Sequence, residues 1–200
     1  MPRKRGQVSA DDVITVAREL LRRDGFGALS VRRLAETLGV SRQVVYTHFG
    51  GMDGLLNHLH RLGAALLAQD VAALTEMPGT DAYVLAAARA YLTAARQRPA
   101  LFELVFAAPI PQYAPNRETI AASRASFGHL IGVAASWLAS HRPMLIDVDR
   151  PGQEAVVMAR VIWSLVHGHI ILEIAGHARS EETDALVETG IQAVLRGWRR

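Results

Sequence analysis

The sequence contains no cysteine, which excludes disulfides, thiolate metal sites and thiol redox sensing. Histidines come close together at His58 and His60 and at His167 and His169. Side chains two residues apart on a helix point to different sides, so neither pair predicts a metal site. We therefore expect no metal and no cofactor.

Catalytic motifs are also missing. The sequence has no glycine-rich phosphate loop and no HExxH, and nothing orders its serine, histidine and aspartate residues into a nucleophile site. We expect that the protein is not an enzyme.

A long uncharged apolar run is the third missing feature. The most apolar stretch, Val156–Ile174, is interrupted by Arg160, His167, His169 and Glu173, which favours a buried helix over a membrane span. The N-terminus has no apolar segment of signal-peptide length, so we expect no export and a cytoplasmic location.

The charge that is present is unevenly distributed. Residues 1–50 hold nine Arg/Lys against five Asp/Glu, whereas residues 51–200 hold thirteen against fourteen. A basic N-terminal part is suited to nucleic acid. Arg3, Lys4 and Arg5 form a short arm that either contacts phosphates or a minor groove, or serves only as a solubilising tail.

Three short amphipathic helices are predicted within residues 9–50. Ser9 and Ser30 are suitable N-caps for helices that begin at about residue 10 and at Val31. The second helix ends at about Leu38, and Gly39 is suited to a left-handed turn after it. Two short helices joined by such a turn indicate a helix-turn-helix.

The next helix carries the predicted DNA-reading face. Ser41 is a candidate N-cap, and Gly50 and Gly51 end the helix after about two turns. The side chains able to hydrogen-bond to phosphates or base edges are Arg42, Gln43, Tyr46, Thr47 and His48. Three arbitrary bundle helices would explain the apolar stripes but not this polar face.

These elements together resemble the TetR family of transcriptional regulators over residues 9 to about 56. The resemblance includes Gly25-Phe26, the capped segment from Ser30 to Ala35, Leu38-Gly39-Val40-Ser41 and Tyr46-x-His48-Phe49. One departure is Met52, which stands where the family usually has a phosphate-binding lysine. The residues that we expect at the DNA interface are Arg3, Lys4, Arg5, Ser30, Arg32, Ser41, Arg42, Gln43, Tyr46, Thr47 and His48.

The rest of the chain predicts helices without a strand pattern or repeat. Their approximate ranges are 53–74, 81–98, 100–106, 117–141, 153–175 and 181–199, with Ser180 as the cap of the last and loops over 109–115 and 143–151. The predicted fold is all-α, with a helix-turn-helix domain at 1–51 and a helical domain at 52–200. The resemblance implies that the second domain binds an effector and dimerises through its last two long helices. Trp163, His167 and Gly168 also resemble a subgroup with a Trp…His-Gly signature.

Dimerisation has its own physical argument. The helix at about 153–175 is apolar on most sides, and the helix at about 181–199 adds further apolar residues. We expect Ile191 in the middle of the interface that these two helices form. A homodimeric four-helix interface would cover both faces, although packing inside one subunit remains an alternative.

Candidate effector-binding residues are aromatic or polar. They are Tyr91, Phe102, Phe106, Phe127, Trp137, Trp163 and His167. An aromatic stripe at helical spacing is also typical of plain core. A pocket of this composition predicts a mostly apolar ligand with few polar groups.

We therefore predict a homodimeric transcriptional regulator, a repressor released from a pseudo-palindromic operator by a small-molecule effector. The alternatives are an activator of the same fold and a non-specific architectural DNA-binding protein. An architectural protein would have no need for about 150 apolar, near-neutral residues after its DNA-binding part.

Overall fold

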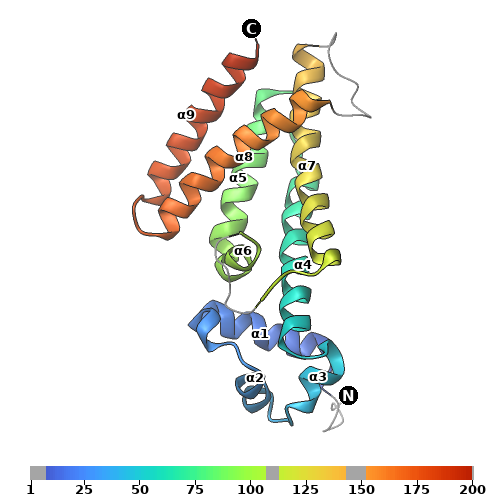
Figure 1. Ribbon diagram of the computed structural model, residues 1–200. Coiled ribbons are helices and arrows are strands. Elements are labelled where there is room, and N and C mark those ends of the chain that lie inside the picture. The colour runs from blue at the N-terminus through green and yellow to red at the C-terminus, as the bar shows by residue number, and fades with distance from the viewer. Residues whose placement is uncertain (1–7, 107–112, 143–151, 200) are drawn as a thin grey trace. The chain divides into compact units, whose positions relative to one another are not determined.

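The computed structural model describes residues 8–106, 113–142 and 152–199 (Figure 1). Within these ranges every regular element is a helix, which confirms the predicted all-α class. The arm at Arg3, Lys4 and Arg5, the loop expected over 143–151 and residues 109–112 of the proline-rich loop lie outside the described residues.

The helices follow the predicted order with boundary shifts of a few residues. They are α1 (Ala10–Asp24), η1 (Phe26–Ala28), α2 (Val31–Leu38), α3 (Gln43–Phe49), α4 (Met52–Ala72), α5 (Asp81–Gln97), α6 (Pro99–Phe106), α7 (Arg117–His141), α8 (Gln153–Ile174) and α9 (Ser180–Trp198).

The chain divides into two compact units. The first comprises Met1–Ala64 and Arg98–Ala122, and the second comprises Ala65–Gln97 and Ser123–Arg200. Helices α4 and α7 each begin in the first unit and continue into the second.

Local capping explains where the first two helices begin and end. The Ser9 hydroxyl accepts from the backbone N–H of Asp12, whose carboxylate accepts from the Ser9 N–H in return. Ser30 accepts from the N–H of Arg33, and Gly39 has φ 68°, as a left-handed C-cap requires. These two caps and the turn are confirmed.

The expected cap of the third helix is wrong. Helix α3 begins at Gln43, with Arg42 as its N-cap residue in the right-handed helical region and without a side-chain capping bond. The Ser41 carbonyl instead accepts the N–H of Val44, so a backbone turn starts the helix. The cap predicted from residue type alone thus placed the start of the helix one residue too early.

The first unit is built around buried apolar side chains of α1 to α4. Val13, Leu34, Val45 and Leu55 have no exposed surface. The first turn of α4 packs directly on the end of α3, because a Cβ placed on Gly54 would overlap the Phe49 carbonyl oxygen. No larger residue fits there unless the backbone moves.

In the second unit α9 packs against both α5 and α8. Figure 1 shows α8 and α9 as adjacent antiparallel helices joined by a short turn. A Cβ on Gly190 would lie 2.6 Å from Leu165 Cδ1, so these two helices approach closely at that point. Arg96 on α5 ties the group together by ion pairs to Glu173 on α8 and Asp184 on α9.

The expected cap of α9 is also wrong. Ser180 is the first residue of that helix, and Arg179 is its N-cap residue. The Ser180 hydroxyl donates to Glu173, and the Glu182 carboxylate accepts the Arg179 backbone N–H. Ser180 therefore joins two helices instead of capping one.

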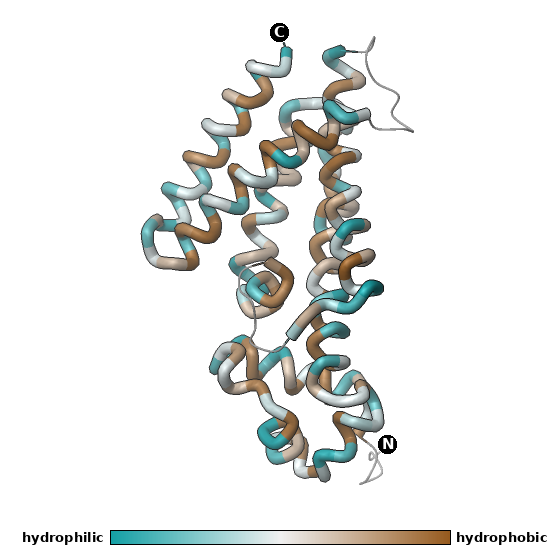
Figure 2. Tube along the Cα trace, viewed as in Figure 1, coloured by the Kyte–Doolittle hydropathy of each residue, from teal (hydrophilic) through white to brown (hydrophobic). Residues whose placement is uncertain are grey.

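Helix α8 is the one helix in the described ranges that is long and apolar enough to cross a membrane by length and composition. The core helix of a soluble protein meets the same test. Figure 2 shows apolar residues along its length with polar residues between them, and it packs against α5 and α9.

Candidate nucleic-acid interface and ligand cavity

Helix α3 separates a buried side from an exposed polar side. Val45 is fully buried beneath it. The predicted DNA-contacting side chains of this segment are all exposed, namely Ser41, Arg42, Gln43, Tyr46, Thr47 and His48. Tyr46 has an exposed fraction of 52% although it is a large aromatic residue. Such a surface offers hydrogen-bonding groups to a phosphate or a base edge.

The flanking helix α2 contributes a further cation. The Arg32 side chain is 70% exposed, and its Nε lies 3.8 Å from the Glu36 carboxylate, a long contact for an ion pair. Arg33 has a stronger partner in Asp24, at 2.6 Å. The Ser30 hydroxyl accepts the Arg33 N–H as the cap of α2, and its O–H can still donate to a phosphate.

His48 has an intramolecular contact that was not predicted from the sequence. Its Nε2 lies 2.9 Å from the Val8 carbonyl oxygen. This bond connects the end of α3 to the residue that precedes the Ser9 cap. The pairing joins residues forty positions apart, so no local signal could have revealed it.

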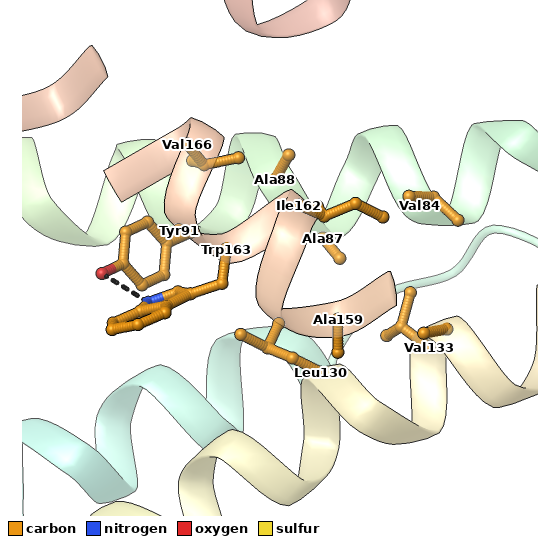
Figure 3. A pocket seen from close by; sticks show the side chains of 11 residues that line it. Val84, Ala87, Ala88, Tyr91, Leu130, Val133, Ala159, Ile162, Trp163 and Val166 are labelled. Carbon is orange, nitrogen blue, oxygen red and sulfur yellow. Dashed lines mark hydrogen bonds between the residues drawn. The ribbon is translucent and has the colours of Figure 1, made fainter. Parts of the chain in front are cut away.

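A small apolar cavity lies among α5, α7 and α8 in the second unit (Figure 3). Its volume is about 30 Å³. Its walls are formed by Val84, Ala87, Ala88, Tyr91, Leu130, Val133, Ala134, Ala159, Ile162, Trp163 and Val166. Figure 3 shows Tyr91 and Trp163 at one end and Val84 and Val133 at the other.

The aromatic end of the cavity carries its polar atoms. The Trp163 indole N–H donates to the Tyr91 hydroxyl at 3.2 Å, and the same hydroxyl shares a 2.8 Å hydrogen bond with His167 Nδ1. Burial raises the pKa of Tyr91 and lowers the pKa of His167. Both shifts favour the neutral forms, so this end presents hydrogen-bonding groups without charge.

The predicted ligand residues fall into three groups. Tyr91 and Trp163 line the cavity, His167 bonds to Tyr91, and Phe127 packs edge-on to Trp163 with ring centroids 5.8 Å apart. Trp137 lies apart from these walls, fully buried, where its indole N–H donates to Asp81.

Two of the predicted ligand residues lie elsewhere. Phe102 and Phe106 belong to α6 in the first unit, where their ring centroids are 5.1 Å apart. Neither is among the residues that line the described cavity.

Sequence reasoning missed the small residues of the cavity wall. Ala87, Ala88, Ala134 and Ala159 leave the space that larger side chains would fill. Alanine is common in any helix, so the sequence does not distinguish these four alanines from the others. They stand out only because the fold brings three helices together around them.

The expectation that Ile191 lies in the middle of the dimer interface is wrong. It is fully buried within its own subunit, as is Leu195 one turn later. The exposed apolar residues of the two helices lie on other faces, namely Val157, Val161, Leu172, Ile174 and Leu186.

The described residues hold no group of three His, Asp or Glu side chains placed to bind a metal ion.

Comparison with known proteins places this arrangement in a family. Residues 13–59 match the model for bacterial regulatory proteins of the tetR family, and residues 84–194 match that for the tetracyclin repressor-like C-terminal domain. The second match alone covers more than half of the chain. The chain belongs to the TetR family.

Individual relatives agree with this assignment. An uncharacterized HTH-type transcriptional regulator of Mycobacterium tuberculosis is 24% identical, over 97% of this chain and 83% of that protein. A solved structure of unknown function from Rhodococcus sp. RHA1 is 24% identical, with a TM-score of 0.77 over 98% of each chain. A TetR variant from Acinetobacter baumannii, solved in complex with minocycline, is 20% identical, with a TM-score of 0.63 over 96% of each chain.

Family membership gives the chain a general activity. It is a helix-turn-helix transcriptional regulator that binds DNA. TetR-family regulators bind operator DNA, form dimers and take small-molecule ligands, and they are regulators and not enzymes.

Proposed function

We propose that the protein is a homodimeric repressor that leaves a pseudo-palindromic operator when a small, mostly apolar effector binds. Residues 1–51 would read the DNA, and residues 52–200 would bind the effector and dimerise. The observation that carries the effector-release mechanism is the size of the cavity.

A cavity of about 30 Å³ is far smaller than the several hundred Å³ of a typical small-molecule site. An effector must therefore widen it and separate helices that now pack together. The effector binds the widened conformation in preference to this one, and that difference is what a population shift requires. If the widened conformation spaces the two recognition helices wrongly, operator affinity falls.

The chemistry of the walls supports an uncharged effector. Among the lining residues that the structure describes there is no ionisable side chain except the neutral Tyr91. A charged ligand would be desolvated there without an opposite charge. The relative from Acinetobacter baumannii binds minocycline, which supports a small organic ligand for this chain.

The exposed polar side of α3 supports direct base reading by Arg42 and Gln43 at its start, with Thr47 and His48 beyond. Tyr46 on the same side would contact a phosphate. Ser41, Ser30 and Arg32 would contact the phosphate backbone, and Arg3, Lys4 and Arg5 would extend that contact.

The exposed side of α8 supports the dimer. Val157, Val161 and Leu172 share one side of the helix with Gly168, where a Cβ would meet open space. Leu186 is the exposed large apolar residue among the described residues of α9. A second copy that covers these residues would bury apolar surface at a two-fold axis.

Selection of bound fragments from a genomic library tests the proposal. We expect enrichment of one inverted repeat, with half-sites about one helical turn or a multiple of it apart. Equal recovery of all sequences would favour the architectural alternative. A reporter placed behind the recovered site should be silenced by the protein, and increased expression would identify an activator.

A further inference from the structure

Helix α7 contributes to two places in the molecule. Its later turns supply Leu130, Val133 and Ala134 to the cavity wall. Its first turn lies in the other compact unit, where Thr119 is fully buried against α4. One continuous helix therefore links the cavity wall to the contact with α4, and a movement of α7 that widens the cavity can reach that contact.

That contact is polar although it is buried. Asn57 on α4 is 6% exposed, and its Oδ1 accepts from the Thr119 hydroxyl at 2.7 Å and from the Asn116 backbone N–H at 2.9 Å. Its Nδ2 donates to the Asp53 carbonyl one turn earlier, at 2.8 Å. Both ends of the Asn57 amide are thus bonded, and its orientation is fixed.

The α7 side of the contact is equally constrained. Asn116 Oδ1 accepts the Thr119 backbone N–H at 2.9 Å and so caps α7. Arg61 on α4 donates to the Thr119 hydroxyl at 3.2 Å. A hydrogen-bonded contact of this kind has one good geometry, whereas an apolar contact would tolerate sliding.

Helix α4 in turn fixes the DNA-reading helix. Its first turn touches the last residue of α3 with no room for a side chain at Gly54. A displacement of α4 therefore carries α3 with it.

We propose that Asn57 and Thr119 form a polar joint through which α7 positions α4 and the recognition helix, so that cavity state and DNA binding are coupled there. This inference rests on the proposed effector-controlled function. Thr119 and Asn57 are positioning residues in it and touch neither DNA nor effector.

The proposal can be tested without knowing the effector, because coupling between two sites is reciprocal. If a ligand in the cavity alters DNA affinity, bound DNA must alter the cavity. The probe is the duplex recovered by genomic selection, and the measurement is backbone hydrogen exchange in residues 159–166 and in α3, with and without saturating duplex.

In the native chain we expect the duplex to slow exchange in α3 and to change exchange in 159–166 by about fivefold or more. Thr119→Val keeps the shape of the side chain and removes the hydroxyl. It should keep the protection of α3 at saturating duplex, while the change in 159–166 falls below about twofold. Thr119→Ser keeps the hydroxyl and should behave like the native chain.

A purely structural role would lower the melting temperature of Thr119→Val and leave the exchange response at 159–166 intact. An intact exchange response in Thr119→Val would overturn the proposal that Asn57 and Thr119 couple the two sites. So would a native chain in which the duplex leaves exchange at residues 159–166 unchanged. If Thr119→Val does not fold, Thr119→Ala replaces it, since it also removes the hydroxyl that donates to Asn57. An undiminished response in Thr119→Ala would then count against the joint. Failure of the native chain to select any duplex would overturn the proposed function itself.

Discussion

Arg96 and Glu173 form a two-point ion pair, with Nε and Nη2 of the guanidinium each 2.8 Å from a different carboxylate oxygen. The Glu173 side chain is only 12% exposed, so solvent screens the pair weakly. The same Nη2 also donates to Asp184 at 2.8 Å. Arg96 of α5 thereby holds both α8 and α9 against α5, which lines the cavity.

The pair predicts an acid-sensitive contribution to stability. Hydrogen bonds from Arg96 lower the pKa of Glu173 to about 2. A carboxylate with a lowered folded-state pKa stabilises the protein fully above its ordinary pKa, near 4.5, and loses that contribution as the pH falls toward 2.

Glu173→Gln should therefore reduce the free energy of unfolding by about 2–3 kcal/mol at pH 7, and the difference from the native chain should shrink between pH 5 and pH 2. Urea unfolding at several pH values measures it. Glu181→Gln, at an exposed position of α9, is the control and should change little. A difference that does not vary with pH would mean that the ionised carboxylate contributes nothing.

Base reading and phosphate contact should separate within α3. Gln43→Ala should reduce discrimination at particular base pairs by about 1–3 kcal/mol, because a lost bidentate contact affects one base and not the others. Tyr46→Phe should weaken operator and random DNA about equally, because a phosphate contact carries no sequence information. Titration of both variants against both duplexes decides it. The reverse pattern would mean that α3 lies in the groove with another face inward.

The contact between α4 and α3 predicts an asymmetry between two glycines. Gly54→Ala should lower stability by about 1–3 kcal/mol, since the new methyl overlaps the Phe49 carbonyl and forces the backbone apart. Gly128→Ala in α7 meets nothing within 4 Å and should raise stability by about 0.5–1 kcal/mol. Thermal unfolding of the two variants gives the comparison, and equal effects would contradict the close approach.

Exposed and buried positions on α9 should respond differently to charge. Leu186 is 51% exposed in the subunit, so Leu186→Glu should leave the subunit folded and yield monomers in sedimentation. Operator affinity should then fall, because one recognition helix engages only one half-site. Gln192→Glu adds the same charge at another exposed position of α9 and is the control. Dimers of Leu186→Glu with native operator affinity would rule out this face as the interface.

Short-range signals predicted much of the DNA-binding part and failed where a neighbour competes. Ser9, Ser30 and Gly39 act on residues within four positions, and the structure has them as expected. Ser180 is also a serine at the predicted start of a helix, but its hydroxyl donates to Glu173, seven residues earlier. A cap cannot be predicted from type alone when a carboxylate from another helix is within reach.

The cavity and the inward face of α9 depended on information that the sequence does not carry locally. Tyr91 and Trp163 could be proposed as ligand-binding residues because aromatic residues often line pockets. Trp137 is an equally good candidate in the sequence, yet in the structure its indole donates to Asp81 away from the cavity. Ile191 and Leu186 are equally apolar, and periodicity cannot say which of two apolar faces meets the same subunit. The Asn57–Thr119 contact joins residues 62 positions apart.

The missing side chain at Gly54 also has a consequence for protein engineering. It limits where the DNA-binding part of this chain could be joined to the ligand-binding part of another regulator. A fusion of this chain cut between residues 51 and 52 would press a foreign first turn of α4 against the Phe49 carbonyl. A donor without glycine at the equivalent position would then place a side chain against that carbonyl and force the end of α3 away from the first turn of α4. Such a fusion should therefore be cut after Gly54, so that the DNA-binding part retains its own supporting turn.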